Sequence, residues 1–432
     1  MDALEKRTVA KVTRRLLPIL VIGYFSAYLD RVNLSFAALQ MNKDLGFSAT
    51  VFGFGAGIFF IGYSIFELPS NLALARFGAR KWIARIMLSW GLLSAGMGFV
   101  TGETGFYVVR VLLGAAEAGF FPGIIFYMTL WFPSVYRARI VGMFVIALPL
   151  SVVIGAPVSG LIYALDGVLG FRGWQWLFLV EAVPSLVMAG VVFFYLTDQP
   201  SAARWLEDDE RAWLIARLDA ERRRREAVHK PSVWQVLYDP KVLGLSVVYF
   251  GSSATSTGIG YFLPQIVKGF GFSNLQTTLI TAIPYACGLF AMIWYGCRSD
   301  LRLERRSHVG FALLMAAVGI GVSTLLNDPV LKIFAFCVAA FGVYGALAVF
   351  WSLPTAMLSG TAAAAGIAVI SSLGNLAGFV GPYTIGVIKD ATGSYAGGLL
   401  AVSYVVVLAV MVLLMLQHDP RLEQPPEPQA TD

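Results

Sequence analysis

Four ionisable side chains lie inside long apolar stretches: Asp30 and Arg31 in one stretch, and Arg110 and Glu117 in another. A charge at the depth of a bilayer costs about 2.5 to 3.5 kcal/mol on insertion scales, so such a residue usually faces a partner or a watery pathway. An arginine presents a planar fork that matches a carboxylate with two parallel hydrogen bonds. A buried carboxyl can hold a proton near neutral pH, because desolvation disfavours its charged form. These residue types therefore indicate carboxylate binding and proton transfer.

The spacing of these residues excludes the simplest pairs. Arg110 and Glu117 share a helix face but lie about 10.5 Å apart along it, and Asp30 and Arg31 point about 100° apart. Pairing across helices is therefore expected, for instance Asp30 with Arg110, which leaves Arg31 and Glu117 to face a central cavity. Two acids and two arginines sum to zero charge, so a proton on Glu117 would balance a bound monoanion. A dianion would need a second proton, which we assign to Asp30.

The composition is that of an integral membrane protein: 57% of the 432 residues are hydrophobic, 13% are charged and the mean hydropathy is +0.72. The formal charge of +6 comes from basic residues between the apolar segments. Membrane anchoring explains that pattern better than nucleic-acid binding does. The sequence has three cysteines and three histidines, and their spacing matches no metal-binding motif. It also contains no P-loop motif and no recognisable set of catalytic residues. No metal, no cofactor, no nucleic-acid partner and no enzymatic activity are expected.

The elements that must position the four charges are membrane-spanning helices, each of which needs about 20 mostly apolar residues. Lys and Arg are concentrated in alternate connections, so the positive-inside rule predicts that both termini are cytoplasmic and that the number of spans is even. Twelve spans are predicted, at residues 16–39, 50–73, 82–100, 106–131, 139–164, 174–196, 240–263, 275–297, 308–326, 330–353, 361–388 and 397–417.

The organisation predicted from this pattern is two six-helix bundles, at residues 1–196 and 240–418. The charged stretch 197–239 between them is interpreted as a cytoplasmic linker with an amphipathic helix, and residues 419–432 as a disordered cytoplasmic tail. Two landmarks recur at an offset of 225 residues: Arg80-Lys81 with Arg305-Arg306, and Pro157 with Pro382. They favour a duplicated, pseudo-symmetric unit. The glycine-rich run 53–57 is interpreted as close helix packing.

The chain resembles the major facilitator superfamily, and within it the anion:cation symporters. The motifs that carry the resemblance are Tyr28-Leu29-Asp30-Arg31 in the first span, Glu67-Leu68-Pro69-Ser70-Asn71 at the end of the second, Arg76-Phe77-Gly78-Ala79-Arg80-Lys81 after it, Arg110 with Glu117, Gly296-Cys297-Arg298-Ser299-Asp300, Gly374-Asn375 and Gly381-Pro382. The sequence departs from the superfamily's loop signature at Asn71, Ala75 and Leu301. The chain looks most similar to bacterial tartrate-type permeases, and next to aromatic-acid and sugar-acid permeases.

The resemblance implies roles for individual residues. The acids Asp30 and Glu117 would couple transport to protons, and the arginines Arg31 and Arg110 would bind the substrate carboxylate. Further substrate contacts are expected from Tyr28, Tyr63, Ser256 and Asn375, and gating from Glu67, Arg76, Arg80 and Asp300. The acid Glu181 is expected to pair locally or to reach the membrane surface.

The function favoured by these observations is proton-coupled import of an organic anion such as tartrate. The expected partners are the anion, protons and lipid, and the expected form is a monomer in the bacterial inner membrane. Two alternatives stay open: a proton-driven antiporter that exports an anionic or drug-like compound, and an aromatic-acid permease for compounds such as phthalate or 4-hydroxyphenylacetate.

Overall fold

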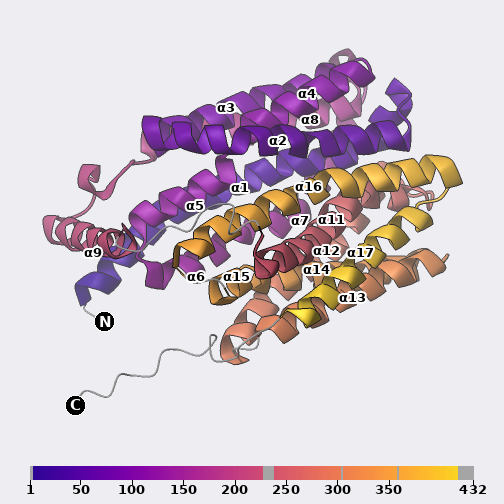
Figure 1. Cartoon of the computed structure of the whole chain (residues 1–432). Helices are drawn as coiled ribbons and strands as arrows, with labels where there is room; N and C mark the ends of the chain where they lie inside the picture. The colour runs from indigo at the N-terminus through magenta and orange to yellow at the C-terminus, as the bar shows by residue number, and fades with distance from the viewer. Residues whose placement is uncertain (1–2, 227–237, 303–304, 358–359, 417–432) are drawn as a thin grey trace. The chain divides into compact units, whose positions relative to one another are not determined.

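The computed structural model describes residues 3–226, 238–302, 305–357 and 360–416, and in these ranges every regular element is a helix (Figure 1). The predicted tail at 419–432 lies outside the described residues. The longer helices are α1 (Ala3–Leu45), α2 (Ala49–Phe77), α3 (Ala79–Gly96), α4 (Glu103–Glu117), α5 (Phe120–Trp131), α6 (Ser134–Val145), α7 (Ala147–Ile162), α8 (Gly173–Tyr195), α9 (Asp208–Glu226), α11 (Pro240–Lys268), α12 (Asn274–Arg302), α13 (Arg305–Leu325), α14 (Pro329–Phe350), α16 (Gly360–Thr392) and α17 (Ala396–Met415). The short ones are η1 (Met97–Phe99), η2 (Tyr163–Leu165), η3 (Val168–Gly170), η4 (Pro200–Ala202) and α15 (Ser352–Met357).

Ten helical segments in the described part of the chain are long and apolar enough to cross a membrane. They do not include α3 and α16, which occupy the third and eleventh predicted spans. The helix α3 carries three basic residues, Arg80, Lys81 and Arg85, within its 18 residues, which lowers its apolar character. The membrane-spanning character is therefore confirmed, while the number twelve and the cytoplasmic termini stay predictions.

The chain divides into two compact units. The first comprises Met1–Ala227, Ile259–Ile283 and Phe379–Tyr395, and the second comprises Val228–Gly258, Pro284–Gly378 and Ala396–Asp432. In the first unit α2 packs along α4, and α8 packs against α1 and α3; Figure 1 shows α2, α3, α4 and α8 running side by side. In the second unit α13 packs against α14 and α17.

Glycines allow the closest helix contacts in the first unit. A β-carbon built on Gly114 of α4 would lie 2.0 Å from the backbone oxygen of Phe59 on α2, and one built on Gly62 would lie 2.5 Å from the backbone oxygen of Val111. A β-carbon built on Gly57 would lie 2.9 Å from the backbone oxygen of Phe379. The interpretation of residues 53–57 as a packing surface is confirmed.

The fourth predicted span is not one continuous helix. Helix α4 ends at Glu117, Ala118 is extended, and Gly119 takes a left-handed conformation with φ of 84° before α5 begins. A side chain at Gly119 would also lie 2.4 Å from Ser70 Oγ, so glycine satisfies both the backbone and the space. The predicted span over 106–131 is matched by the apolar segment Glu103–Trp131, but two helices form it instead of one. The break could not be predicted, because glycine is common inside membrane helices and its presence alone does not mark a break.

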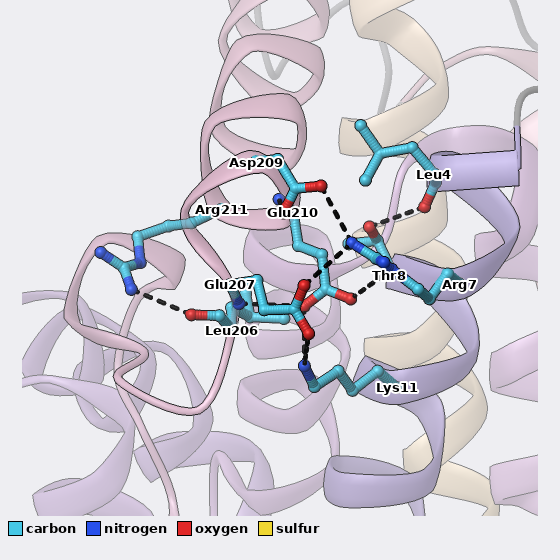
Figure 2. A network of polar contacts seen from close by, with 9 residues as sticks. All are labelled: Leu4, Arg7, Thr8, Lys11, Leu206, Glu207, Asp209, Glu210 and Arg211. Carbon is cyan, nitrogen blue, oxygen red and sulfur yellow. Dashed lines mark hydrogen bonds and ion pairs between the residues drawn. The ribbon is translucent and has the colours of Figure 1, made fainter.

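The charged helix α9 is docked on the start of α1 (Figure 2). Arg7 contacts Glu207, Asp209 and Glu210 at 3.1, 2.9 and 3.0 Å, and Lys11 Nζ lies 2.8 Å from Glu210 Oε2. Burial raises the pKa of the Glu210 carboxyl, but hydrogen bonds from Lys11 and from the Glu207 backbone N–H, together with both cations, outweigh it. The pKa of Glu210 therefore lies below its ordinary value.

Candidate functional site

Asp30 lies on the face of α1 that contacts α3 and α8, and its side chain is 3% exposed. It accepts hydrogen bonds from Trp90 Nε1 at 2.9 Å, from Ser94 Oγ at 2.8 Å and from Ser185 Oγ at 2.5 Å. The expected pair of Asp30 with Arg110 is wrong. The sequence could not reveal this, because which faces of two helices meet depends on their rotation and not on residue type.

Arg31, one residue further along α1, points toward α4 and pairs with Glu117. Its Nη2 lies 2.6 Å and its Nε 2.8 Å from Glu117 Oε1. The side chain of Glu117 is 3% exposed and that of Arg31 is 16% exposed. A buried ion pair that includes a charge-assisted hydrogen bond is strong while intact, and it leaves an uncompensated cation if the acid loses its charge.

Aromatic rings surround the Arg31 guanidinium. Its Cζ lies 5.3 Å from the ring centroid of Tyr28, 5.2 Å from that of Phe59 and 5.4 Å from that of Tyr63. Rings within about 6 Å attract a cation through their quadrupole. The structure thus brings Tyr28 and Tyr63 to Arg31. It adds Phe59, which no pattern in the sequence distinguished from an ordinary packing residue.

Arg110 is 1% exposed, and its Cζ lies 4.8 Å from the centroid of the same Phe59 ring. Its Nε donates to Gly55 O at 3.0 Å, and its Nη2 donates to Ala56 O at 3.0 Å and contacts Tyr261 Oη at 3.4 Å. Arg110 therefore fastens α4 to the backbone of α2 and to the part of α11 that belongs to the first unit. Both guanidinium groups share the ring of Phe59, so the cluster carries two cations around one acid, Glu117.

The remaining predicted substrate residues are Ser256 on α11 and Asn375 on α16. Both are partly buried and belong to the second unit. Glu67, one turn after Tyr63 on α2, is partly buried and is close enough to Arg31 to interact electrostatically. Its position extends the cluster by one helical turn.

Of the predicted gating residues, Arg76 is exposed and stacks on the ring of Phe77. The backbone N–H of Arg80 donates to Asp198 Oδ1 at 2.7 Å, so a carboxylate that follows α8 caps the start of α3. An acid at a helix N-terminus is favourable, and Asp198 provides it although Ala75 cannot. No pattern in the sequence indicated that Asp198 caps this helix. The side chain of Asp300 lies outside the described residues.

A second acid that sequence analysis undervalued is Glu181 on α8. It is 2% exposed, and its Oε1 accepts a hydrogen bond from Ser159 Oγ at 2.6 Å. It does pair locally, but the alternative of a side chain reaching the membrane surface is wrong. Nothing in the sequence shows that α1, α3 and α7 cover this turn of α8.

Comparisons with known proteins place the chain in a family. The sequence model of the Major Facilitator Superfamily matches residues 20–382. A protein of Agrobacterium vitis named "Putative tartrate transporter" is 50% identical over 416 residues, which cover 96% of each chain. A "Quinolone resistance transporter" of Acinetobacter baumannii is 40% identical over 94% of each chain. The solved xylose transporter XylE from E. coli, in a partially occluded inward open conformation, matches with a TM-score of 0.75 over 95% of this chain and 98% of that one, at 14% identity.

The likeness to XylE shows the fold alone, because the two sequences are so different. The likeness to the Agrobacterium vitis protein extends over nearly the whole of both chains. The predicted resemblance to the superfamily and to tartrate-type permeases is confirmed by these matches. The chain belongs to the Major Facilitator Superfamily, whose members are multi-pass membrane transporters and not enzymes.

Proposed function

We propose that this protein imports an organic carboxylate anion together with protons by alternating access. The observation that supports the proposal most directly is the buried ion pair of Arg31 with Glu117 inside a ring of aromatic side chains. A substrate carboxylate has the same chemistry as the Glu117 side chain, so the two compete for the same guanidinium. A proton on Glu117 removes its charge and frees Arg31 for the substrate.

The charges of the cluster support coupling in a fixed direction. Among the described residues Glu117 forms the ion pair with Arg31, and Arg110 lies close to the same Phe59 ring as Arg31. When Glu117 is protonated, Arg31 loses its ion-pair partner and the site attracts another anion. When the substrate leaves, Glu117 must release its proton to compensate Arg31 again. Binding of anion and proton is therefore mutually favourable, which is what symport requires.

The roles of the other residues follow from this arrangement. We assign Tyr28 and Tyr63 to contacts with the substrate and Arg110 to the positive charge that attracts it. Ser256 and Asn375 are assigned to contacts with substrate hydroxyls. Asp30 is assigned to a second proton. Glu67, Arg76, Arg80 and Asp300 are assigned to gating.

The substrate class is a small hydroxy acid, with tartrate as the first candidate. It is supported by the name of the 50% identical protein from Agrobacterium vitis, together with the two arginines near one acid. The test is uptake by proteoliposomes of tartrate, a sugar acid, phthalate and 4-hydroxyphenylacetate at two pH values. We expect faster uptake of one acid when the outside is acidic. Uptake of every acid at a rate independent of pH would refute the proposal.

Variants at the site sharpen this test. Arg31→Ala is expected to abolish uptake, because it removes the guanidinium fork. Glu103→Gln, which removes an exposed carboxyl at the start of α4, is the matched control and is expected to transport normally. Uptake by Arg31→Ala at the wild-type rate would refute the assignment of this arginine.

A second candidate is proton-driven export of an anionic drug-like compound. The observation that favours it is the 40% identity with a protein named "Quinolone resistance transporter". A counterflow assay with the proton gradient reversed distinguishes the two. An importer accumulates substrate when protons enter with it, whereas an antiporter accumulates it when protons leave.

The proposal includes the predicted architecture. Two six-helix bundles at 1–196 and 240–418, joined by the linker 197–239, would give twelve spans with both termini in the cytoplasm. We propose that the protein acts as a monomer in the bacterial inner membrane.

A further inference from the structure

Two carboxyl groups are buried in the first unit away from the arginine cluster. Asp30 is 3% exposed and Glu181 is 2% exposed. In the part of the chain that the structure describes, neither forms an ion pair with a lysine or an arginine. Two ionised carboxylates so far from water and without cations would be costly, because each charge loses its hydration and repels the other.

Helix α8 carries Glu181 and also Ser185, whose hydroxyl contacts Asp30 of α1. Ser185 lies four residues after Glu181, so the two side chains share one face of α8 a single turn apart. The Ser185 hydroxyl donates to Asp30 Oδ2 at 2.5 Å. The carboxyls of Asp30 and Glu181 are close enough to interact electrostatically.

The hydrogen bonds of Asp30 and Glu181 differ, and the difference indicates which of the two carboxyls is ionised. Asp30 accepts three hydrogen bonds, from Trp90, Ser94 and Ser185, and donors of this kind stabilise an ionised carboxylate. Glu181 accepts one, from Ser159, and its Oε2 is buried without a hydrogen-bond partner. An ionised oxygen in that position would lose its hydration without replacement, whereas a neutral acid loses less. The arrangement fits an ionised Asp30 beside a protonated Glu181.

We propose that Glu181 is a further proton-binding site and that, with Asp30, it forms a coupled pair of carboxyls that takes up and releases protons during transport. The inference deepens the proposed function and rests on it. When a proton binds to Asp30, the charge that opposed ionisation of Glu181 disappears. Glu181 can then release its proton. One proton thus enters the pair at Asp30 and one leaves it from Glu181, so the pair never carries two negative charges. No other reactant is needed.

The groups that face Glu181 leave few competing explanations for a change with pH. Helix α1 contributes Asp30, which interacts electrostatically with Glu181 and with Glu117 of α4. The α3 residues Trp90 and Ser94 contact Asp30 and do not titrate. After α7, Tyr163 of η2 lies close enough to interact with Glu181, and its hydroxyl donates to Phe36 O at 2.6 Å. A titration that disappears when Glu181 is changed therefore belongs to this carboxyl pair.

The test compares wild type with Glu181→Gln, which keeps the side-chain shape and its bond to Ser159. In proteoliposomes, the reversal potential of uptake gives the number of protons that move with each substrate ion. We expect the variant to exchange substrate across the membrane while moving about one proton fewer. Glu103→Gln, the exposed control, is expected to keep the wild-type proton number. An unchanged proton number in Glu181→Gln would overturn the proposal.

A second measurement needs no substrate. Infrared difference spectra of the purified protein, recorded from mildly acidic to mildly alkaline pH, report protonated carboxyls through their C=O stretch. We expect Glu181→Gln to lose one titrating band and Asp30→Asn to shift the pH at which that band changes. If no band depends on Glu181, the proposal is overturned whatever the transport assay shows. If that band titrates but wild-type uptake ignores pH, the proton site stands and the proposed symport fails.

Should Glu181→Gln fail to fold, Ser159→Ala provides the same test in a milder form. It removes only the hydrogen bond to Glu181 Oε1 and is expected to shift the Glu181 band in the infrared titration. A band that titrates in Ser159→Ala as it does in wild type would overturn the proposal.

Discussion

Replacing Glu117 by glutamine keeps the side-chain shape but fixes it in a neutral form. In wild type a substrate carboxylate must displace Glu117 from Arg31, which holds one Glu117 oxygen through a hydrogen bond of 2.8 Å and an ion-pair contact of 2.6 Å. The glutamine oxygen still accepts one such bond, but it carries no charge. The variant therefore competes more weakly with the substrate for the arginine.

The expected gain in affinity follows from these contacts. A hydrogen bond to a charged group contributes about 1.5 to 3 kcal/mol, and the substitution removes the equivalent of about one of them. At alkaline pH, where Glu117 of the wild type is ionised, the variant should bind substrate roughly 10- to 150-fold more tightly. The difference should disappear at acidic pH, where the wild-type side chain also becomes neutral.

Calorimetric titration of the purified protein with the best substrate of the uptake panel measures this difference directly. Uptake against a concentration gradient should be lost in the same variant, while exchange across the membrane continues. Glu103→Gln controls for removal of a carboxyl as such. Equal affinity of wild type and Glu117→Gln at alkaline pH, or full concentrative uptake by the variant, would show that Glu117 does not compete with the substrate.

Two further predictions concern stability. Gly114→Ala should destabilise the protein by about 1 to 3 kcal/mol, because the added methyl would meet the backbone oxygen of Phe59. Thermal unfolding measures this loss of stability. The control is Gly142→Ala, whose added methyl would meet no atom within 4 Å and which should be neutral or stabilising. Because the folded-state pKa of Glu210 lies below its ordinary value, the stability that its ion pairs contribute is present above the unfolded pKa of about 4.3 and is lost as the pH falls through the lower folded-state pKa. Tryptophan fluorescence, to which Trp205 just before α9 contributes, should show a change in acid that is smaller in Glu210→Gln. An identical acid response in that variant would contradict the assignment.

Much of the fold could be predicted from the sequence, because bilayer thickness fixes the length of an apolar helix and charges are excluded from its middle. The predicted sixth span at 174–196, for example, matches α8 at Gly173–Tyr195. The break between α4 and α5 could not be predicted. It depends on the left-handed backbone of Gly119 beside Ser70, and neighbouring helices determine whether that conformation forms.

The candidate site shows the same limit. Spacing correctly excluded a direct pair of Arg110 with Glu117, and the structure brings Arg31, Glu117, Tyr28 and Tyr63 together. The pairing of Arg31 with Glu117 could not be predicted from the sequence. Adjacent residues on a helix point about 100° apart, and the rotation of α1 decides which of them faces α4.

The break after Glu117 has a consequence for how the fourth span crosses the bilayer. At 1.5 Å per residue, the 15 residues of α4 and the 12 of α5 measure only about 22 and 18 Å, each less than the roughly 30 Å of hydrocarbon. The interruption therefore falls within the apolar layer, where lipid offers no partners for the free carbonyls at the end of α4 or the free N–H groups at the start of α5. Such a gap persists only where protein or water replaces lipid, and Ala118 and Phe120 are 0% and 1% exposed. The polar backbone ends beside Glu117 are thus shielded from the membrane by the bundle itself.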